Sequence, residues 1–203
     1  TPEPSLQWCG AEEVPVIEEF LPSSRGIRFS NGRVEQNIDA VIFATGYLYA
    51  YPFLTSLTNP PIVTDGRRVC GLYQHIFRID HPTLAFVGLP IKVVPFPVAE
   101  SQAALVARTW ANLLPLPSKE EMKRWEEDEE KARQEGKFHV WGEGEDSRYI
   151  NGVWEVIERS GTPGKKPPRW SPEQVWQRTV YAKAKLAFEL GGRRAESLEE
   201  LGF

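Results

Sequence analysis

The sequence has few of the residues that build disulfide, redox or metal sites. Its 203 residues include only two cysteines, Cys9 and Cys70. These two form no metal or redox motif, so we interpret them as free buried thiols in a reducing compartment, with one disulfide between them as the alternative. This interpretation predicts a cytoplasmic location and no metal site.

Long apolar runs and an excess of basic residues are also lacking. No stretch approaches the roughly 20 apolar residues that span a bilayer, and the net charge is −4. We therefore expect neither a transmembrane segment nor a nucleic-acid partner. Hydrophobic residues make up 41% and charged residues 26% of the chain, a balance that is typical of a domain with a packed core.

Methionine is scarce as well. The chain begins with Thr1, and its only methionine is Met122. Because translation starts at methionine, we expect the chain to be a fragment or a processed or trimmed product of a longer protein. Such a piece can lack parts of a site that the complete protein contains.

The first part of the chain carries strand-like patterns separated by turns. Val14–Phe20 is a candidate edge strand, and Gly26–Phe29 alternates with the period of a strand. Ser30–Arg33 contains an Asn-Gly pair that is typical of a tight hairpin. Asp39–Ala44 is a nearly continuous apolar run of the kind found in strands buried on both faces of a parallel sheet. Leu84–Gly88 is predicted to be a second apolar strand that ends on glycine.

The remaining sequence is dominated by helical patterns. Ser118 and Glu121 form a capping box for a charged helix, whose acidic face we interpret as solvated. Pro172 in a first turn and Gly191 after a last turn mark the beginning and end of another helix. The predicted helices cover residues 98–114, 119–135, 148–159 and 172–190.

The segment from Asp39 to Tyr47 is the most informative in the chain. It is predicted to be a buried strand that ends in a turn at Thr45 and Gly46, where a glycine without a Cβ lets a ligand approach the backbone. Ligands of open α/β sheets bind beyond the carboxyl ends of strands, so these two residues lie where a dinucleotide is expected. An ordinary core strand with a glycine turn is the alternative.

Several segments match one enzyme family. Phe43–Tyr47 (FATGY) resembles the ATGY signature of flavin-containing monooxygenases, although Baeyer–Villiger and N-hydroxylating monooxygenases carry similar motifs. Tyr73–Phe77, His81–Leu89 and Val94–Ala103 are similar to the flavin-containing monooxygenase pattern of this region, and Tyr149–Asn151 is a weaker echo of fungal-type members. The chain therefore resembles the C-terminal portion of a fungal-type, dimethylaniline monooxygenase-like flavin-containing monooxygenase.

The resemblance implies an α/β fold. It predicts part of a flavoprotein with two dinucleotide-binding domains of the Rossmann-like, FAD/NAD(P)-binding type, followed by a helical C-terminal extension. Residues 1–38 would be the end of the NADPH-binding domain, residues 39–114 the C-terminal half of the FAD-binding domain, and residues 115–203 the helical extension.

The resemblance also implies an activity. In such an enzyme NADPH reduces FAD, oxygen then forms a C4a-hydroperoxyflavin, and this species oxygenates the nitrogen or sulfur atom of a small amine or sulfide. The expected cofactors are FAD and NADPH, and the expected partner is the N-terminal half of the same enzyme, with a homodimer left open. No catalytic acid, base or nucleophile is assigned here, because the flavin performs the difficult chemistry.

The cofactor contacts are expected at the end of two strands and the beginning of one helix. In related flavoproteins a helix N-terminus faces the pyrimidine side of the flavin ring, where its N–H groups and dipole stabilise negative charge. Ser101 and Gln102 are placed in the first turn of that helix, with an exposed helix glutamine as the alternative for Gln102. His75 is interpreted as a core histidine. The expected cofactor-binding residues are Thr45, Gly46, Tyr47, Gly88, Pro97, Val98, Ser101 and Gln102.

The sequence lacks the family's phosphate-binding loops. Neither of the two Gly-x-Gly-x-x-Gly loops occurs, and the Phe-x-Gly-x-x-x-His motif is absent. We therefore expect the isolated chain to be inactive. Two alternatives remain: a non-catalytic or interaction module that needs its N-terminal partner, and a Baeyer–Villiger-type relative that acts on ketones.

Overall fold

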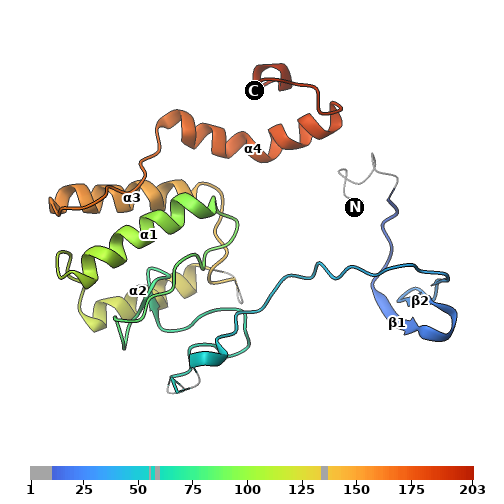
Figure 1. Ribbon diagram of the computed structural model, residues 1–203, viewed down its shortest axis with the longest axis horizontal. Coiled ribbons are helices and arrows are strands. Elements are labelled where there is room, and N and C mark those ends of the chain that lie inside the picture. Colours follow the sequence, from blue (N-terminus) through green and yellow to red (C-terminus); the bar gives the residue numbers. More distant parts are fainter. Residues whose placement is uncertain (1–10, 55, 58–59, 134–136) are drawn as a thin grey trace. The chain divides into compact units, whose positions relative to one another are not determined.

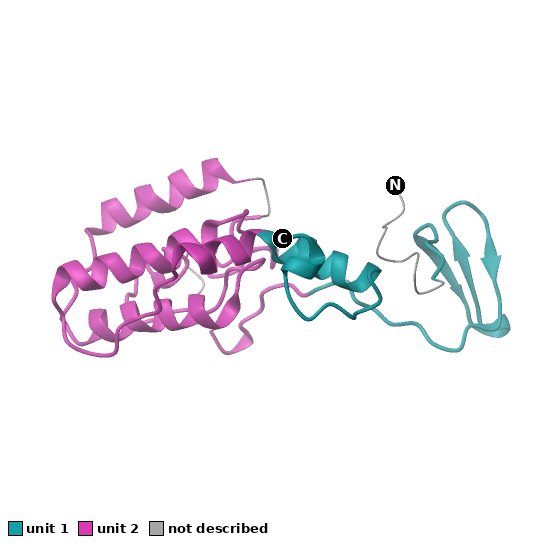
Figure 2. Cartoon of the chain, turned by 90° about the horizontal axis from the view of Figure 1, so that it is seen from above, with its two compact units in different colours: residues 1–46, 180–203 teal, residues 47–179 magenta. Residues whose placement is uncertain are grey.

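The computed structural model describes residues 11–54, 56–57, 60–133 and 137–203. Figure 1 shows the chain coloured along its sequence, and its residues divide into two compact units. One contains residues 1–46 and 180–203, and the other contains residues 47–179 (Figure 2). The domain boundaries predicted after residues 38 and 114 stay predictions.

The first unit contains a small antiparallel sheet in the order β1-β2-β3. β1 (Ile17–Leu21) lies at its edge, as predicted for Val14–Phe20, and β2 (Gly26–Phe29), also predicted to be a strand, lies in its centre. β3 (Val34–Glu35) pairs with β2 through a hairpin, in which Gly32 adopts a φ of 83°. The Asn-Gly signal was therefore a correct indication of the turn.

The prediction of a buried strand at Asp39–Ala44 is wrong for the described chain. Residues 36–46 form no strand, and the side chains of Ile42 and Phe43 are 89% and 70% exposed. A strand buried in a parallel sheet needs a hydrogen-bonded neighbour on each side. The part of the chain that the structure describes places no such neighbour beside this segment.

The second unit contains a short hairpin of β4 (Leu72–Tyr73) and β5 (Phe77–Arg78). Residues 84–88 were predicted to form a strand, but they contribute only a bridge between Ala85 and Phe77. Pairing ends after Phe86, whose amide donates to the Ile76 carbonyl over 2.9 Å. Gly88 then leaves the extended conformation with a φ of 83°.

Four helices follow, and their types were predicted correctly. They are α1 (Pro95–Trp110), α2 (Lys119–Ala132), α3 (Glu145–Ser160) and α4 (Pro172–Leu190) (Figure 1). The capping box of α2 is confirmed, because Ser118 and Glu121 bond reciprocally. α1 and α3 each begin three residues before the predicted start, since their first turns hold prolines and acidic residues rather than the apolar residues that signal a helix.

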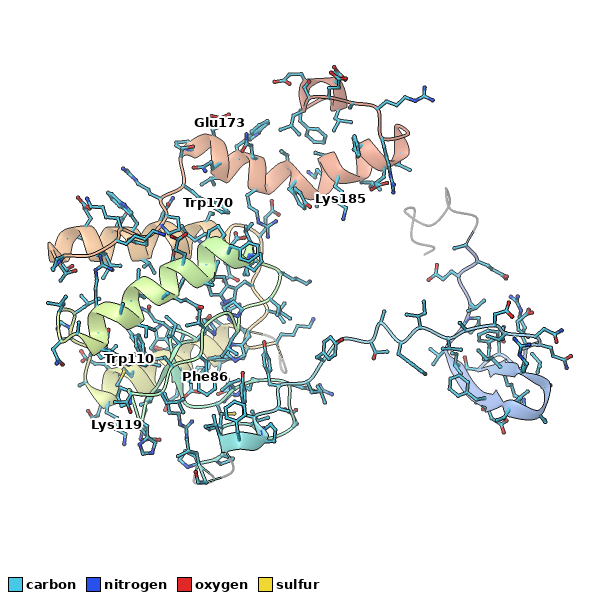
Figure 3. All side chains as sticks on the ribbon, in the orientation of Figure 1. Phe86, Trp110, Lys119, Trp170, Glu173 and Lys185 are labelled. Carbon is cyan, nitrogen blue, oxygen red and sulfur yellow. The ribbon has the colours of Figure 1, made fainter. Side chains whose placement is uncertain are left out.

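The main core of the second unit lies between α1, α3 and the β4–β5 hairpin. Figure 3 shows the side chains, with Phe86 in the interior and Trp110 at the end of α1. Phe86 is 7% exposed, whereas Trp110 is 52% exposed. The buried cluster that joins α1 and α3 to the hairpin consists of Ile76, Phe77, Leu105, Val106, Val153 and Ile157. The architecture is therefore mixed α/β, with helices packed on a minimal hairpin.

Two sequence expectations concern features outside the core. Cys70 is a free, half-buried thiol that accepts a 3.4 Å hydrogen bond from Arg68 Nε, and Cys9 lies outside the described residues. Among the helices of the described chain, none combines the length and apolar character required to cross a bilayer.

Candidate functional site

Gly88 and α1 form the first part of the candidate site. The Gly88 amide donates a 2.8 Å hydrogen bond to Gln102 Oε1, and this bond holds the turn at Gly88 against α1. Gly88 is exposed, and a Cβ built on it would meet no atom within 4 Å. The space beside this backbone is open, which allows a flat ligand to approach closely.

Ser101 and Gln102 are buried beneath this turn. Both are 0% exposed, and both lie in the second turn of α1 because the helix begins at Pro95. Their predicted place in the first turn is therefore wrong, as is the alternative of an exposed Gln102. Ser101 Oγ and Gln102 Nε2 have no hydrogen-bond partner among the described residues. Both atoms are closed to solvent, and the Gln102 side chain lies close to the Tyr149 hydroxyl, so these two residues shape the turn from below rather than present polar atoms at its surface.

The beginning of α1 offers one free donor. Pro95 and Pro97 have no N–H group, and the amide of the N-cap residue Val94 donates to Asp146 Oδ2 over 3.1 Å. The amide of Phe96 is thus the only N–H group left for a ligand in the first turn. The Phe96 side chain is 85% exposed.

The structure separates the eight predicted cofactor residues into two groups. It brings Gly88, Pro97, Val98, Ser101 and Gln102 together around the first two turns of α1, where Val98 is 0% exposed in a cluster with Trp141 and Ile150. Thr45, Gly46 and Tyr47 lie where one unit ends and the other begins, in irregular, exposed backbone. Gly46 has a φ of 81°, but residues 41–50 form no turn, so the predicted turn at Thr45 and Gly46 is not found.

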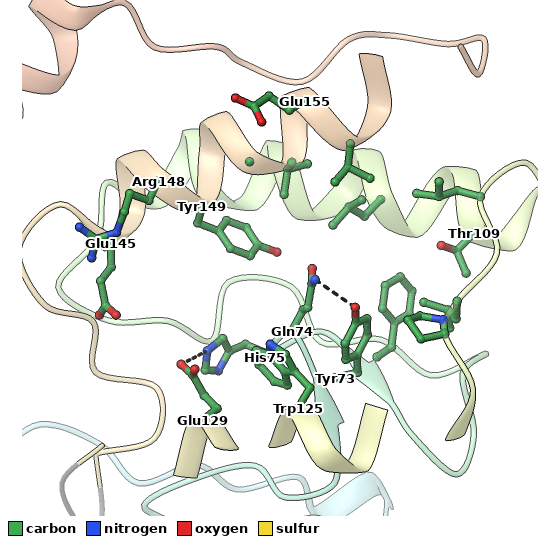
Figure 4. Close-up of a pocket in the computed structure, with 18 of the residues that line it drawn as sticks. Tyr73, Gln74, His75, Thr109, Trp125, Glu129, Glu145, Arg148, Tyr149 and Glu155 are labelled. Carbon is green, nitrogen blue, oxygen red and sulfur yellow. Dashed lines mark hydrogen bonds and ion pairs between the residues drawn. The ribbon is translucent and has the colours of Figure 1, made fainter. Parts of the chain in front are cut away.

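A second feature is a cavity of about 640 Å³ inside the second unit (Figure 4). It lies between α1 and α3 on one side and α2 with the β4–β5 turn on the other. Both aromatic rings and charged side chains line it. Its aromatic lining residues are Tyr73, His75, Phe77, Trp125, Trp141 and Tyr149.

A chain of hydrogen bonds connects this cavity to the core. Val69 N donates to His139 Nε2 over 3.1 Å, and the Nδ1 atoms of His139 and His75 lie 3.0 Å apart. His75 Nε2 lies 3.4 Å from Glu129 Oε1. Because His139 Nε2 accepts, we infer that neutral His139 donates from Nδ1 and that neutral His75 carries its proton on Nε2, facing Glu129. Trp141 Nε1 lies 3.3 Å from His75 Nε2. Because His75 Nε2 carries a proton in this tautomer, it does not accept a hydrogen bond from Trp141.

The burial of this chain shifts its titrations. Burial, supported by the neighbouring His75, lowers the pKa of His139 to about 3. Burial also lowers the pKa of His75, although Glu129 opposes the shift. The hydrogen bond to His75 and the pairing with Arg133 lower the pKa of Glu129. At neutral pH this chain of hydrogen bonds therefore contains two neutral imidazoles and an ionised carboxylate, of which His75 and Glu129 line the cavity. The interpretation of His75 as a core histidine is consistent with its 2% exposure.

Sequence reasoning missed the structural use of the acidic helix α2. Glu126 accepts a 2.6 Å hydrogen bond from the Gly71 amide, and Glu129 pairs with His75 and Arg133. The interpretation of a wholly solvated face was therefore wrong for these two glutamates. Glu126 and Glu129 follow the buried Met122, which is 4% exposed, at helical spacing, so all three side chains lie on one side of α2. This spacing was the sequence signal that the two glutamates face the protein.

Comparisons with known proteins agree on one family. Residues 5–167 match the family model described as "FMO-like: Flavin-binding monooxygenase-like". The chain is 34% identical over 156 residues to "Flavin-containing monooxygenase iboF" of Amanita muscaria (strain Koide BX008), covering 66% of this chain and 29% of the relative. It is 40% identical over 123 residues to human "Flavin-containing monooxygenase 2", covering 59% and 22%.

One solved structure is similar to most of this chain. The S-allyl-L-cysteine S-oxygenase from Allium sativum superposes with a TM-score of 0.59 and 27% identity, covering 90% of this chain and 38% of that one. The chain spans between 22% and 29% of the length of the curated relatives just compared. The described residues contain no group of three or more histidine, cysteine, aspartate or glutamate side chains arranged to hold a metal ion.

Proposed function

This chain belongs to the flavin-binding monooxygenase-like family, and from that premise we propose that it forms the flavin-facing wall of an FAD- and NADPH-dependent monooxygenase. The complete enzyme would oxygenate nitrogen or sulfur atoms of small amines or sulfides. The family uses FAD and NADPH, and "Thiol-specific monooxygenase" is the name of a yeast relative that is 34% identical over 113 residues.

The contact between Gly88 and Gln102 carries this proposal. It holds an exposed turn without a Cβ against the first two turns of a helix, and the Phe96 amide at the beginning of that helix is free to donate. These features fit a planar heteroaromatic ring with several polar edges better than they fit an ordinary surface loop. Bound flavin would supply the redox and oxygen-transfer chemistry.

The residues of this wall would bind and orient the ring. Gly88 would allow close approach of the backbone, and the Phe96 amide would donate a hydrogen bond at the end of α1. The helix dipole would favour negative charge at that end by about 0.3–1 kcal/mol. Gln102 would keep the turn in place, and Asp146 would do the same for the Val94 amide.

An exposed apolar segment supports an N-terminal partner. Ile42, Phe43 and Tyr47 are 89%, 70% and 103% exposed, which is unusual for an apolar run with the pattern of a central strand. We propose that the N-terminal half of the same enzyme covers this segment by strand pairing and supplies the phosphate-binding loops. In this arrangement residues 1–38, 39–114 and 115–203 would be the end of the NADPH domain, the closing half of the FAD domain and the helical extension.

The proposal can be tested in two steps. The purified chain is mixed with FAD and desalted, and we expect little retained flavin colour. The coding sequence upstream of residue 1 is then read for two Gly-x-Gly-x-x-Gly loops and expressed together with the chain. That complex should retain FAD and consume NADPH with N,N-dimethylaniline or methyl phenyl sulfide. Turnover of cyclohexanone instead would favour the Baeyer–Villiger alternative, and the absence of both loops would favour an interaction module.

A matched pair of glycine variants locates the flavin. Gly88 and Gly161 both have positive φ angles, 83° and 62°, and at both an added Cβ would meet no atom within 4 Å. Gly88→Ala should therefore cost about as much stability as Gly161→Ala, but only Gly88→Ala should weaken FAD retention by the complex. Equal FAD retention in the two variants would contradict the placement of the ring beside Gly88.

A further inference from the structure

The loop from Gly88 to Val94 connects the exposed glycine turn to the N-terminus of α1. It belongs to no helix or named strand, and Lys92 in its middle has a φ of 63°. A lysine keeps this left-handed conformation only when the surrounding structure holds it. Because the loop lies between two parts of the proposed flavin-facing wall, its conformation determines where the Phe96 amide lies relative to Gly88.

The first half of the loop is held by two distant segments. Tyr49 Oη donates a 2.7 Å hydrogen bond to the Leu89 carbonyl. The Ile91 amide donates to the His139 carbonyl over 2.9 Å, and the Ile91 carbonyl accepts from the Trp141 amide over 3.2 Å. Each of these partners lies at least 40 positions away in the sequence, so the loop depends on the tertiary structure.

The second half of the loop is held by Arg178, in the first half of α4. Arg178 Nη2 donates a 2.9 Å hydrogen bond to the Lys92 carbonyl, and its Nε donates a 2.7 Å hydrogen bond to Asp146 Oδ2. The same Asp146 oxygen accepts the Val94 amide over 3.1 Å. One guanidinium and one carboxylate therefore hold the loop on both sides of Val93. Arg178 and the loop belong to the same compact unit.

An arginine suits this position better than a lysine. The planar guanidinium carries several N–H donors in fixed directions, so Arg178 bonds a carboxylate and a carbonyl at once, whereas an ammonium group is a point charge. The Asp146 side chain is 1% exposed and that of Arg178 is 26% exposed. The pair is thus shielded from solvent, unlike the exposed ion pairs that contribute little.

From these contacts we propose that Arg178 is a positioning residue for the bound flavin. It would act through the Lys92 carbonyl and Asp146, which keep the Phe96 amide at the place where it can donate to the ring. The helical extension would thereby take part in cofactor binding through the loop. This inference rests on the proposed function, since it takes Gly88 and the beginning of α1 as the flavin-facing wall.

The first test measures the loop in the 203-residue chain without any cofactor. Arg178→Met removes the donors and keeps the length of the stem, Arg178→Lys keeps the charge, and Lys183→Met, at an exposed lysine of the same helix, is the matched control. Amide hydrogen exchange is followed by NMR. In Arg178→Met the Val94 amide should exchange at least about fivefold faster relative to the Leu105 amide in the core of α1. In Arg178→Lys the increase should be smaller, and Lys183→Met should cause none.

The ratio of the two exchange rates separates a local effect from a general loss of stability. A variant that is only less stable opens the Val94 and Leu105 amides to the same extent. An unchanged ratio in Arg178→Met would overturn the claim that Arg178 holds the loop, whatever the complete enzyme binds.

The second test uses the complex of this chain with its N-terminal half. Arg178→Met should raise the Kd for FAD about five- to tenfold, because the Phe96 amide is no longer held in place. A helix N-terminus favours negative charge, so reduced flavin should lose about fivefold more affinity than oxidised flavin. That difference lowers the two-electron reduction potential by about 20 mV. Arg178→Lys should lie between Arg178→Met and the original complex, and Lys183→Met should match the original.

The outcomes distinguish this inference from the proposed function. Retained FAD whose Kd and reduction potential do not change in Arg178→Met would overturn the inference alone. An original complex that retains no FAD would overturn the proposed function and the inference with it. A merely structural arginine would lower the free energy of unfolding and leave the reduction potential of the bound flavin unchanged.

Discussion

The Gly88 amide donates its hydrogen to Gln102 Oε1 over 2.8 Å. This contact joins residues 14 positions apart in the sequence and ties a glycine turn to the second turn of α1. Because Gln102 is 0% exposed, the turn depends on a side chain that solvent does not reach. A buried side chain therefore determines the conformation of the turn in the proposed flavin-facing wall.

The first prediction concerns this contact. Gln102→Met keeps the length of the side chain but removes the acceptor, so the Gly88 amide loses its partner. We expect the free energy of unfolding to fall by about 1–3 kcal/mol, measured by urea denaturation. Gln177→Met, at an exposed glutamine of α4, is the matched control and should change it by less than about 0.5 kcal/mol. Equal effects of the two variants would show that the Gly88 contact adds nothing.

The second prediction is a dependence of stability on pH. Burial lowers the folded-state pKa of His75 and lowers that of His139 to about 3, whereas both would titrate near 6.5 when unfolded. The unfolded chain therefore binds more protons below about pH 6.5. The stability contributed by each neutral imidazole is complete above that pH and is lost as the pH falls toward the folded pKa, with a slope of up to about 1.4 kcal/mol per pH unit for each histidine.

Urea denaturation between pH 8 and pH 4 would measure this loss. In the His139→Gln variant the slope below about pH 6.5 should be smaller than in the original chain, whereas His81→Gln, at an exposed histidine, should leave it unchanged. A slope that is the same in all three proteins would contradict the burial of neutral histidines.

The third prediction contrasts two glycines. Gly152 lies inside α3 beside open space, so Gly152→Ala should raise the free energy of unfolding by about 0.5–1 kcal/mol through helix propensity. Gly71 has a φ of 68°, and a Cβ there would collide with the Arg78 guanidinium. Gly71→Ala should therefore destabilise the chain by about 1–3 kcal/mol. Thermal unfolding distinguishes the two, and a destabilised Gly152→Ala would show that the space beside α3 is filled.

The fourth prediction concerns Asp146, which is 1% exposed and binds three elements of the fold. It accepts hydrogen bonds from the amides of Val94 and Ser147 and pairs with Arg178 at 2.7 Å. Asp146→Ala should cost about 3–5 kcal/mol, because a buried ion pair and two amide contacts are lost together. Asp146→Asn, which keeps an acceptor, should cost less.

An exposed acidic residue of the same helix is the control for Asp146. Glu155 lies 3.9 Å from Arg159 with its side chain 63% exposed. Glu155→Ala should change the free energy of unfolding by about 0.5 kcal/mol or less in the same urea titration. A similar loss for Glu155→Ala and Asp146→Ala would mean that the buried aspartate is not a structural anchor.

The helices were predictable from the sequence because their signals are local. The capping box of Ser118 and Glu121 and the ends of α4 at Pro172 and Leu190 depend on residues within one or two turns. The hairpin between β2 and β3 was equally visible from the turn around Gly32. In each case neighbouring residues satisfy the same backbone groups that determine the conformation.

Strand predictions were less reliable because a strand needs a partner distant in sequence. Asp39–Ala44 has the composition of a central strand, but the described residues provide no neighbours for it. Residues 84–88 pair with β5 at one bridge only. The composition of a segment indicates whether its side chains favour burial, whereas strand pairing depends on whether another strand lies next to it in the fold.

The sequence by itself determined the family resemblance, the type and approximate limits of the helices, the hairpin turn around Gly32 and the end of strand pairing before Gly88. Only the tertiary structure decided that Gln102 is buried under Gly88, that His75 and His139 share a hydrogen-bond chain with Glu129, and that a cavity lies beneath Tyr149. The reason is physical. Helix ends and turns are satisfied by neighbours in the chain, whereas burial, tautomer and cavity shape depend on side chains brought together from distant segments.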